Sequence, residues 1–246
     1  MESSDLKSQI SNLKSQTYAI IVAGGSGSRM QAAVPKQFLL LGRLPVLMHT
    51  LRNFYQSKLQ PQLILVLPAD FHLYWQQLCV EYKFDIPHQL VSGGETRFHS
   101  VKNGLDLIPD DEEAIVAVQD AVRPLTDTSI IDHSFNSAAE NGNAVTAVKS
   151  RDSVRQIKND YSVSLVRDEI YLIQTPQTFQ LAQLKKAYQQ PYNPKFTDDA
   201  SVVEETGEIR DMETCAIVLI DFWVEDWEAV TSNSASIAYY SYPGEG

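Results

Sequence analysis

The chain has 246 residues, of which 43% are hydrophobic, and this size suits one large α/β domain rather than two full domains. Its formal net charge of −11 argues against nucleic acids and anionic membranes as partners, although small anions can bind where a few cations gather. Cys79 and Cys215 form no metal-ligand or disulfide pattern, so the cytoplasm is the expected location.

The first 17 residues are polar and lack the apolar core of a secretory signal. We therefore expect a flexible lead-in over residues 1–17 and a single domain over 18–246. No stretch approaches the roughly 18 apolar residues that a membrane-spanning helix requires. Residues 18–23 form an apolar run that predicts a buried parallel strand.

A glycine-rich turn follows this strand, with Gly24, Gly25 and Gly27 in four successive positions. Such a turn brings several backbone N–H groups close to a ligand. Arg29 and Lys36 follow within a few residues, so the stretch predicts a phosphate-binding cradle. The alternative is a strand-to-helix turn with ordinary surface cations.

The next elements are predicted from apolar spacing alone. Residues 46–55 and 71–82 carry apolar side chains at helical intervals, and residues 63–67 form a short apolar strand. His72 and His88 are isolated histidines, for which packed or solvated roles are more common than catalytic ones.

A second turn of the same kind follows a strand that ends near residue 92. Gly93 and Gly94 precede Glu95 and Ser100, which enter a predicted helix. Parallel strands end at one edge of a sheet, so both glycine turns are expected there, beside any bound ligand. Taken alone, Gly93 and Gly94 would indicate an ordinary tight turn.

Residues 114–118 predict a third buried strand, which runs into Asp120 and Arg123. A carboxylate and a cation at a strand end suit a metal or a polar substrate group, whereas the alternative is a structural ion pair. Residues 144–148 predict a fourth strand. The alternating stretch 149–175 then predicts a projecting hairpin that packs against another chain.

After the hairpin, residues 175–179 lead the chain back to the body, and residues 182–188 have a helical pattern. Thr197 and Asp198 belong to a cluster of capping residues before a last helix over 202–205. Capping alone is a sufficient explanation for both side chains.

Seven motifs over residues 18–204 together resemble a known family, the 2-C-methyl-D-erythritol 4-phosphate cytidylyltransferases of the non-mevalonate isoprenoid pathway. In order, they are AGGSGSRM, PKQF, SGGETRFHSV, VQDAVRP, SRDSV, TPQTF and FTDDAS. The resemblance implies a glycosyltransferase-A or nucleotidyltransferase-type α/β fold. Such a fold has a mixed, mostly parallel sheet with helices on both faces and a projecting β-arm.

The resemblance also implies a reaction, in which CTP and methylerythritol phosphate give CDP-methylerythritol and pyrophosphate. It implies a homodimer that exchanges β-arms, and Mg²⁺ held mainly by the CTP phosphates, with no metal ligand firmly assigned. A ribitol 5-phosphate cytidylyltransferase is a close alternative, and a catalytically impaired nucleotide-binding dimer is another. A dinucleotide-dependent dehydrogenase is disfavoured because Met30 replaces the third glycine of its fingerprint.

The family motifs carry site residues onto this sequence in three groups. Arg29 and Lys36 are the expected catalytic cations on the triphosphate. The expected CTP contacts are Ala23, Gly24, Gly25, Gly27, Gly94, Glu95 and Ser100. The expected acceptor contacts are Asp120, Arg123 and Thr197, together with Ser153 and Arg167 from the arm of a partner chain.

The segment 206–246 departs from the family pattern. It carries eight acids and one base, which account for about −7 of the net charge of −11, and Lys195 is the last lysine of the chain. Aligning Val230 and Thr231 with the family's VT pair places Glu228 and Ala229 around the position of a phosphate-binding cation. Loss of such a donor typically costs on the order of 10²–10³ in rate, so we predict weak activity. A natural divergence and a reading-frame discrepancy both remain open as causes.

Overall fold

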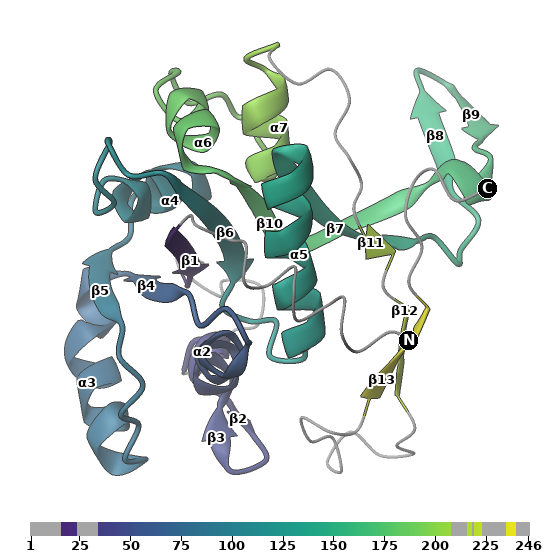
Figure 1. Ribbon diagram of the computed structural model, residues 1–246. Coiled ribbons are helices and arrows are strands. Elements are labelled where there is room, and N and C mark those ends of the chain that lie inside the picture. The colour runs from purple at the N-terminus through teal and green to yellow at the C-terminus, as the bar shows by residue number, and fades with distance from the viewer. Residues whose placement is uncertain (1–15, 24–33, 208–215, 218, 223–234, 240–246) are drawn as a thin grey trace, which may run out of the picture.

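The computed structural model describes residues 16–23, 34–207, 216–217, 219–222 and 235–239. Its centre is a seven-stranded sheet with the strand order β11-β7-β10-β6-β1-β4-β5 (Figure 1). The strands are β1 (Gln16–Val22), β4 (Gln62–Leu67), β5 (Gln89–Ser92), β6 (Ala114–Asp120), β7 (Asn143–Lys149), β10 (Tyr171–Gln180) and β11 (Ala216–Ile217). β10 is antiparallel to both of its neighbours, and the other pairs are parallel. The predicted mostly parallel sheet is confirmed.

The central strands are continuous apolar runs because both of their faces are covered. Ile20 of β1 packs into a core on one face of the sheet, and the next residue, Ile21, packs into the core on the other face. Val66 and Leu65 of β4 divide between the two cores in the same way. All four side chains are almost completely buried.

Helices cover both faces, as predicted. They are α2 (Val46–Gln56), α3 (His72–Glu81), α4 (Arg97–Leu105), α5 (Thr128–Asn141), α6 (Leu181–Ala187) and α7 (Asp199–Glu204). Three short 3-10 helices are η1 (Lys36–Phe38), η2 (Ala69–Phe71) and η3 (Arg167–Glu169). Helices α4, α6 and α7 pack on one face, and α2, α3 and α5 pack on the other. Both isolated histidines are packed: the rings of His72 and His88 bond to main-chain carbonyls.

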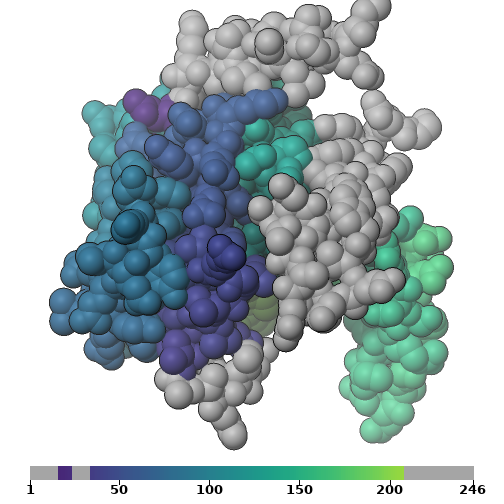
Figure 2. All heavy atoms as spheres, turned by 90° about the horizontal axis from the view of Figure 1, so that it is seen from below, coloured from purple at the N-terminus to yellow at the C-terminus, as the bar shows by residue number. Residues whose placement is uncertain are grey.

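The projecting hairpin is confirmed, and we call residues 150–170 the arm. It contains the antiparallel strands β8 (Arg155–Lys158) and β9 (Tyr161–Ser164), joined by a turn in which Asn159 has a φ of 49°. All residues of both strands are exposed. Figures 1 and 2 show the arm extending beyond the body of the molecule.

The boundaries of the arm differ from the prediction. Residues 171–175, expected in the hairpin, belong to β10 in the middle of the sheet, and Lys149 ends β7. The pattern hid this ten-residue strand because Pro176 and several polar residues interrupt it. Thr178 is nevertheless completely buried, with its hydroxyl bonded to Ser134.

Two smaller hairpins complete the described structure. β2 (Leu40–Leu41) pairs with β3 (Leu44–Pro45), and β12 (Leu219–Phe222) pairs with β13 (Ala235–Tyr239). At the other end of the chain, β1 begins at Gln16, so the last two residues of the expected lead-in belong to the sheet. None of the described helices is long and apolar enough to cross a membrane.

Candidate active site

Both glycine turns leave the sheet at the same edge, as predicted. The N–H of Ala23, directly after β1, donates to the carbonyl of Val66 at 2.8 Å. The N–H of Gly93, directly after β5, donates to the carbonyl of Leu67 at 3.0 Å. Asp120 lies in register with the last residue of β1, so this carboxylate and the starts of both turns share one edge.

The centre of the first turn lies outside the described residues, and the roles expected there stay predictions. They concern Gly24, Gly25, Gly27 and Arg29. At the borders of the segment, Ala23 is buried, and Lys36 is half-buried at the start of η1. The side-chain amide of Gln37 donates to the carbonyl oxygen of Ala23 at 3.2 Å. Sequence analysis did not single out Gln37.

The second turn is organised by Ser100. The hydroxyl of Ser100 accepts a hydrogen bond from the N–H of Gly94 at 3.1 Å and donates to the carbonyl of Thr96 at 2.9 Å. Ser100 is only 1% exposed, whereas Glu95 is exposed. Ser100 therefore shapes the turn, and the contacts of Gly94, Glu95 and Ser100 with a nucleotide stay predictions.

Asp120 is the centre of a charged cluster. One of its carboxylate oxygens accepts from Nε of Arg123 at 3.0 Å, and the other accepts from Nε of Arg97 at 3.4 Å. Arg97 also donates from both terminal nitrogens to the two oxygens of Asp199, at 2.9 and 2.6 Å. The hydroxyl of Tyr188 donates to Asp199 at 2.6 Å. The side chain of Asp199 is completely buried, and three hydrogen bonds from Arg97 and Tyr188 fix it.

Arg97 and Tyr188 keep their protonated forms near neutral pH. Burial opposes the charged form of Arg97, but the carboxylates of Asp199 and Asp120 outweigh this effect and raise its pKa. Burial, and then the negative charge of Asp199, raise the pKa of Tyr188 well above its ordinary value. Arg97 therefore stays a cation, and Tyr188 stays a neutral donor.

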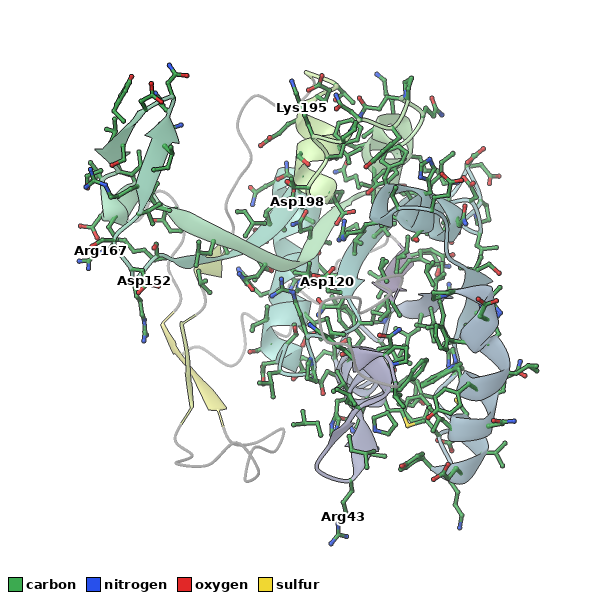
Figure 3. The ribbon with its side chains drawn as sticks, turned by 180° about the vertical axis from the view of Figure 1, so that it is seen from behind. Arg43, Asp120, Asp152, Arg167, Lys195 and Asp198 are labelled. Carbon is green, nitrogen blue, oxygen red and sulfur yellow. The ribbon has the colours of Figure 1, made fainter. Side chains whose placement is uncertain are left out.

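A cavity of about 350 Å³ opens beside this cluster. Of the expected acceptor contacts, it brings together Asp120, Arg123 and Thr197. The other lining residues were not assigned a site role from sequence: Arg97, Ile173, Gln174, Thr175, Gln177 and Asp198. Figure 3 shows Asp120 and Asp198 in this part of the body. Thr197 is exposed, whereas Asp198 caps α7 in a capping box with Ser201.

An irregularity in β10 supplies one wall of the cavity. The register of β10 against β7 shifts between Ile173 and Gln177, and the intervening residues are turned out of the regular ladder. Gln174 accepts a hydrogen bond from Arg123, and the hydroxyl of Thr175 accepts one from the N–H of Asp120 at 3.2 Å. The bulge thus contacts both predicted residues on β6 and its following turn.

Gln177 joins this wall to α7. Its amide nitrogen donates to the carboxylate of Asp198 at 3.0 Å, and its amide oxygen accepts from the N–H of Ala200 at 2.8 Å. Gln177 is only 1% exposed. The signal in the sequence that could have identified Gln177 is a polar residue within a strand.

The two acceptor contacts expected from the arm lie elsewhere. Ser153 and Arg167 are both exposed, and neither lines the cavity. Figure 3 shows Asp152 and Arg167 on the arm, away from Asp120. Arg167 donates to the carbonyl of Arg151 at 3.4 Å, within the arm. One chain therefore does not bring these residues to its own cavity.

The expected cation of the last segment, at the position of Glu228, lies outside the described residues. Within the part of the chain that the structure describes, no group of three or more His, Cys, Asp or Glu side chains could hold a metal ion. Asp120 already accepts from two arginines. The donors around the cavity thus favour anions and hydroxyl groups over a metal cage of protein ligands.

A mostly parallel sheet with two glycine turns at one edge, beside an arginine-lined cavity, has the architecture of a nucleotidyltransferase. The solved structures similar to this chain support that class. The 4-diphosphocytidyl-2C-methyl-D-erythritol synthase from Anaerococcus prevotii is 29% identical with a TM-score of 0.68, and the match covers 81% of this chain and 85% of that one. The 2-C-methyl-D-erythritol 4-phosphate cytidylyltransferase from Francisella tularensis is 31% identical with a TM-score of 0.62, covering 78% and 87%.

Sequence comparisons define the family. The family model described as IspD, 2-C-methyl-D-erythritol 4-phosphate cytidylyltransferase, matches residues 17–212. The enzyme of that name from Porphyromonas gingivalis is 47% identical over 192 residues, which cover 78% of this chain and 85% of the relative. The one from Bacteroides fragilis is 44% identical over 189 residues, covering 77% and 85%. The chain belongs to this family of transferases.

Proposed function

We propose that the chain transfers a cytidylyl group from CTP to 2-C-methyl-D-erythritol 4-phosphate and releases pyrophosphate. The observation that carries the proposal is the meeting of Asp120, Arg123 and Thr197 in one cavity, at the sheet edge where both glycine turns begin. The family match and relatives of that name at 44–47% identity support the same reaction.

The cavity has the donors and acceptors that a phosphorylated polyol requires. Each oxygen of Asp120 accepts one hydrogen bond from an arginine and retains a second lone pair for a substrate hydroxyl. Arg123 uses Nε and one terminal nitrogen, and its other terminal nitrogen makes no hydrogen bond with the described residues. Arg123 therefore offers a donor to an anion. Thr197 adds an exposed hydroxyl at the rim.

The chemistry needs positioning more than acid–base catalysis. A phosphate monoester is already largely ionised at neutral pH, so its oxygen can attack the α-phosphate of CTP in line, with pyrophosphate as the leaving group. In this proposal, Arg29 and Lys36 stabilise charge on the triphosphate, while the turn that begins at Ala23 wraps its oxygens with backbone N–H groups from Gly24 to Gly27. Gly94, Glu95 and Ser100 contact the cytidine.

We propose Mg²⁺ as the cofactor, held chiefly by the CTP phosphates. Bound there, the ion would neutralise part of the triphosphate charge. The arginines around Asp120 support this assignment, because they pair Asp120 and Asp199 with cations of the protein. We also place the reaction in the cytoplasm, which is consistent with two cysteines that follow no disulfide pattern.

We propose further that two chains exchange arms to complete each other's sites. The arm exposes large apolar side chains, among them Ile157 at 72% and Tyr161 at 59%, and it has no core of its own. Ser153 and Arg167 are exposed on it, and neither lines the cavity of its own chain. A second chain would supply the missing contact surface and receive both side chains at its acceptor phosphate.

The test measures pyrophosphate release from CTP and Mg²⁺ with methylerythritol phosphate and, separately, with ribitol 5-phosphate. We expect turnover with methylerythritol phosphate. Turnover with ribitol 5-phosphate alone would instead assign the chain to the pentitol phosphates. Binding of CTP without product from either acceptor would support an impaired enzyme, for which the acidic segment 206–246 is the argument from sequence. Glu228→Lys should then restore activity.

A further inference from the structure

Arg97 occupies an unusual position for a cation. It is the first residue of α4, directly after the N-cap Thr96, where the helix dipole and the unpaired N–H groups disfavour positive charge. Asp199, by contrast, is the first residue of α7, where the dipole favours a carboxylate. The bidentate pair between Arg97 and Asp199 thus joins the N-termini of α4 and α7. The positive charge of Arg97 is unfavourable at the N-terminus of α4, but it allows this pair to form.

Arg97 connects three functional parts of the site, one through its position in the chain and two through its guanidinium. Arg97 begins the helix that follows the second glycine turn, and Ser100, one turn later, bonds to Gly94 of that turn. Its Nε donates to Asp120 on the acceptor side. Its terminal nitrogens bind Asp199, which directly follows the cavity residue Asp198. No other described arginine bonds to both Asp120 and a completely buried carboxylate.

Removal of this charge would affect both Asp120 and Asp199. Arg97 and Arg123 each fix one oxygen of Asp120, so the plane of the carboxylate is set by both arginines together. Without Arg97, one oxygen loses its partner, and Asp199 becomes a buried carboxylate held only by the Tyr188 hydroxyl. Both effects would add uncompensated negative charge beside a cavity that is expected to receive a phosphate.

We propose that Arg97 is a positioning residue that orients Asp120 for the acceptor and fixes it relative to the cytidine turn through the buried Asp199–Tyr188 pair. The inference rests on the proposed function, because that function defines which side of the site binds the acceptor and which side binds CTP. Arg97 acts through Asp120, and its loss should therefore weaken use of the phosphorylated acceptor more than binding of CTP.

The experiment compares Arg97→Lys with wild type in steady-state pyrophosphate release. Lysine keeps the charge but cannot hold Asp199 with two nitrogens and Asp120 with a third. We expect kcat/KM for methylerythritol phosphate to fall by about 10- to 100-fold, as displaced catalytic groups typically cause. The KM for CTP should change by less than about twofold. Asp110→Asn is the matched control, because it breaks the ion pair of Asp110 with Lys185 on the surface.

A double-mutant cycle distinguishes positioning from general loss of structure. In an Asp120→Asn background, Arg97→Lys should cause little further loss, because the residue through which it acts is already altered. Equal fold losses in both backgrounds, or equal increases in both KM values, would overturn the positioning role. If Arg97→Lys does not fold, Asp199→Asn replaces it in the same double-mutant cycle. Tyr188→Phe is a milder alternative.

The controls separate this inference from the function on which it rests. An active wild type with Arg97→Lys indistinguishable from Asp110→Asn would overturn the positioning role alone. A folded wild type that gives no pyrophosphate with methylerythritol phosphate would overturn the proposed function, and the role of Arg97 with it.

Discussion

Gln37 holds the carbonyl oxygen of Ala23 at 3.2 Å, and so connects the two ends of the glycine-rich segment 24–33. Both residues are buried, Gln37 at 3% and Ala23 at 4% exposure. Lys36, one of the two expected catalytic cations, is the neighbour of Gln37 in the chain. The hydrogen bond therefore holds the residue before the segment, Ala23, close to the backbone that carries Lys36.

Gln37→Met removes the donor while it keeps the length of the side chain. Because the buried carbonyl of Ala23 loses its partner, we expect the free energy of unfolding to fall by about 1–3 kcal/mol. We also expect the KM for CTP to rise, since the segment that follows Ala23 is no longer anchored. Urea unfolding and initial rates measure both effects. Gln76→Met, at an exposed position of α3, is the control. An unchanged KM for CTP would contradict the anchoring role.

Gly104 allows α4 to approach the sheet. A Cβ at this position would lie 2.8 Å from Cγ2 of Ile20 and 3.2 Å from Cγ2 of Val66. Gly104→Ala gains about 1 kcal/mol of helix propensity but overpacks a region where 1–3 kcal/mol is a typical cost. We predict a net loss of stability, measured by chemical unfolding. The partly exposed Lys102→Ala in the same helix should change little, and a stabilised Gly104→Ala would refute the prediction.

His88 makes stability depend on pH. Its Nε2 accepts from Nε1–H of Trp75 at 2.9 Å, and its Nδ1 lies 2.8 Å from the carbonyl of Ile86, so the ring is neutral with the proton on Nδ1. Burial lowers the pKa of His88 below 6.5, although the Ile86 carbonyl opposes the shift. The unfolded chain therefore takes up the proton first as pH falls.

This linkage gives a signed prediction. The contribution of His88 is complete above about pH 6.5 and is lost as the pH falls through the lower pKa of the folded protein. His88→Gln keeps an acceptor for Trp75 but does not titrate. We expect the difference in unfolding free energy between wild type and variant to shrink between pH 7.5 and 5. A difference that is constant over this range would show that the ring does not titrate in this way.

Exchange of arms can be tested by complementation. Asp120→Asn alters the cavity, and Arg167→Ala alters the arm, so each homodimer should keep only a small, measurable residual activity. In a mixed dimer, one site combines an intact cavity with an intact arm from the other chain. Random reassociation should then recover about a quarter of the wild-type activity, because half of the dimers are mixed and each has one complete site. A mixture no more active than its components would mean that the arm serves its own chain.

Much of the sheet was predictable because its central strands are buried on both faces. The apolar run that contains Ile20 and Ile21 indicates such a strand directly, and glycines after β1 and β5 mark the edge of the sheet. The family motifs likewise placed Asp120, Arg123 and Thr197 together, and the cavity contains all three.

The remaining part depends on contacts between distant residues. Arg97 and Asp199 are 102 positions apart, and no local pattern connects them. The one available signal was a cation at the start of a predicted helix, where it needs a partner. β10 was missed for a related reason: Thr175, Gln177 and Thr178 are buried through hydrogen bonds, which a hydrophobic pattern does not report.

The base of the arm and the bulge in β10 separate the arm from the sheet. On the arm side of the bulge, the N–H of Ser150 donates to the carbonyl of Ile170 at 2.8 Å, which closes the base of the arm. Beyond the bulge, Gln177 and the residues after it keep their own register with β6 and β7. The bond between Ser150 and Ile170 precedes Ile173, the first residue of β10 that lines the cavity, so a change in the length of the arm ends at this bond. Arms of different length that keep Ser153 and Arg167 could be grafted between Ser150 and Ile170 without a change in the sheet.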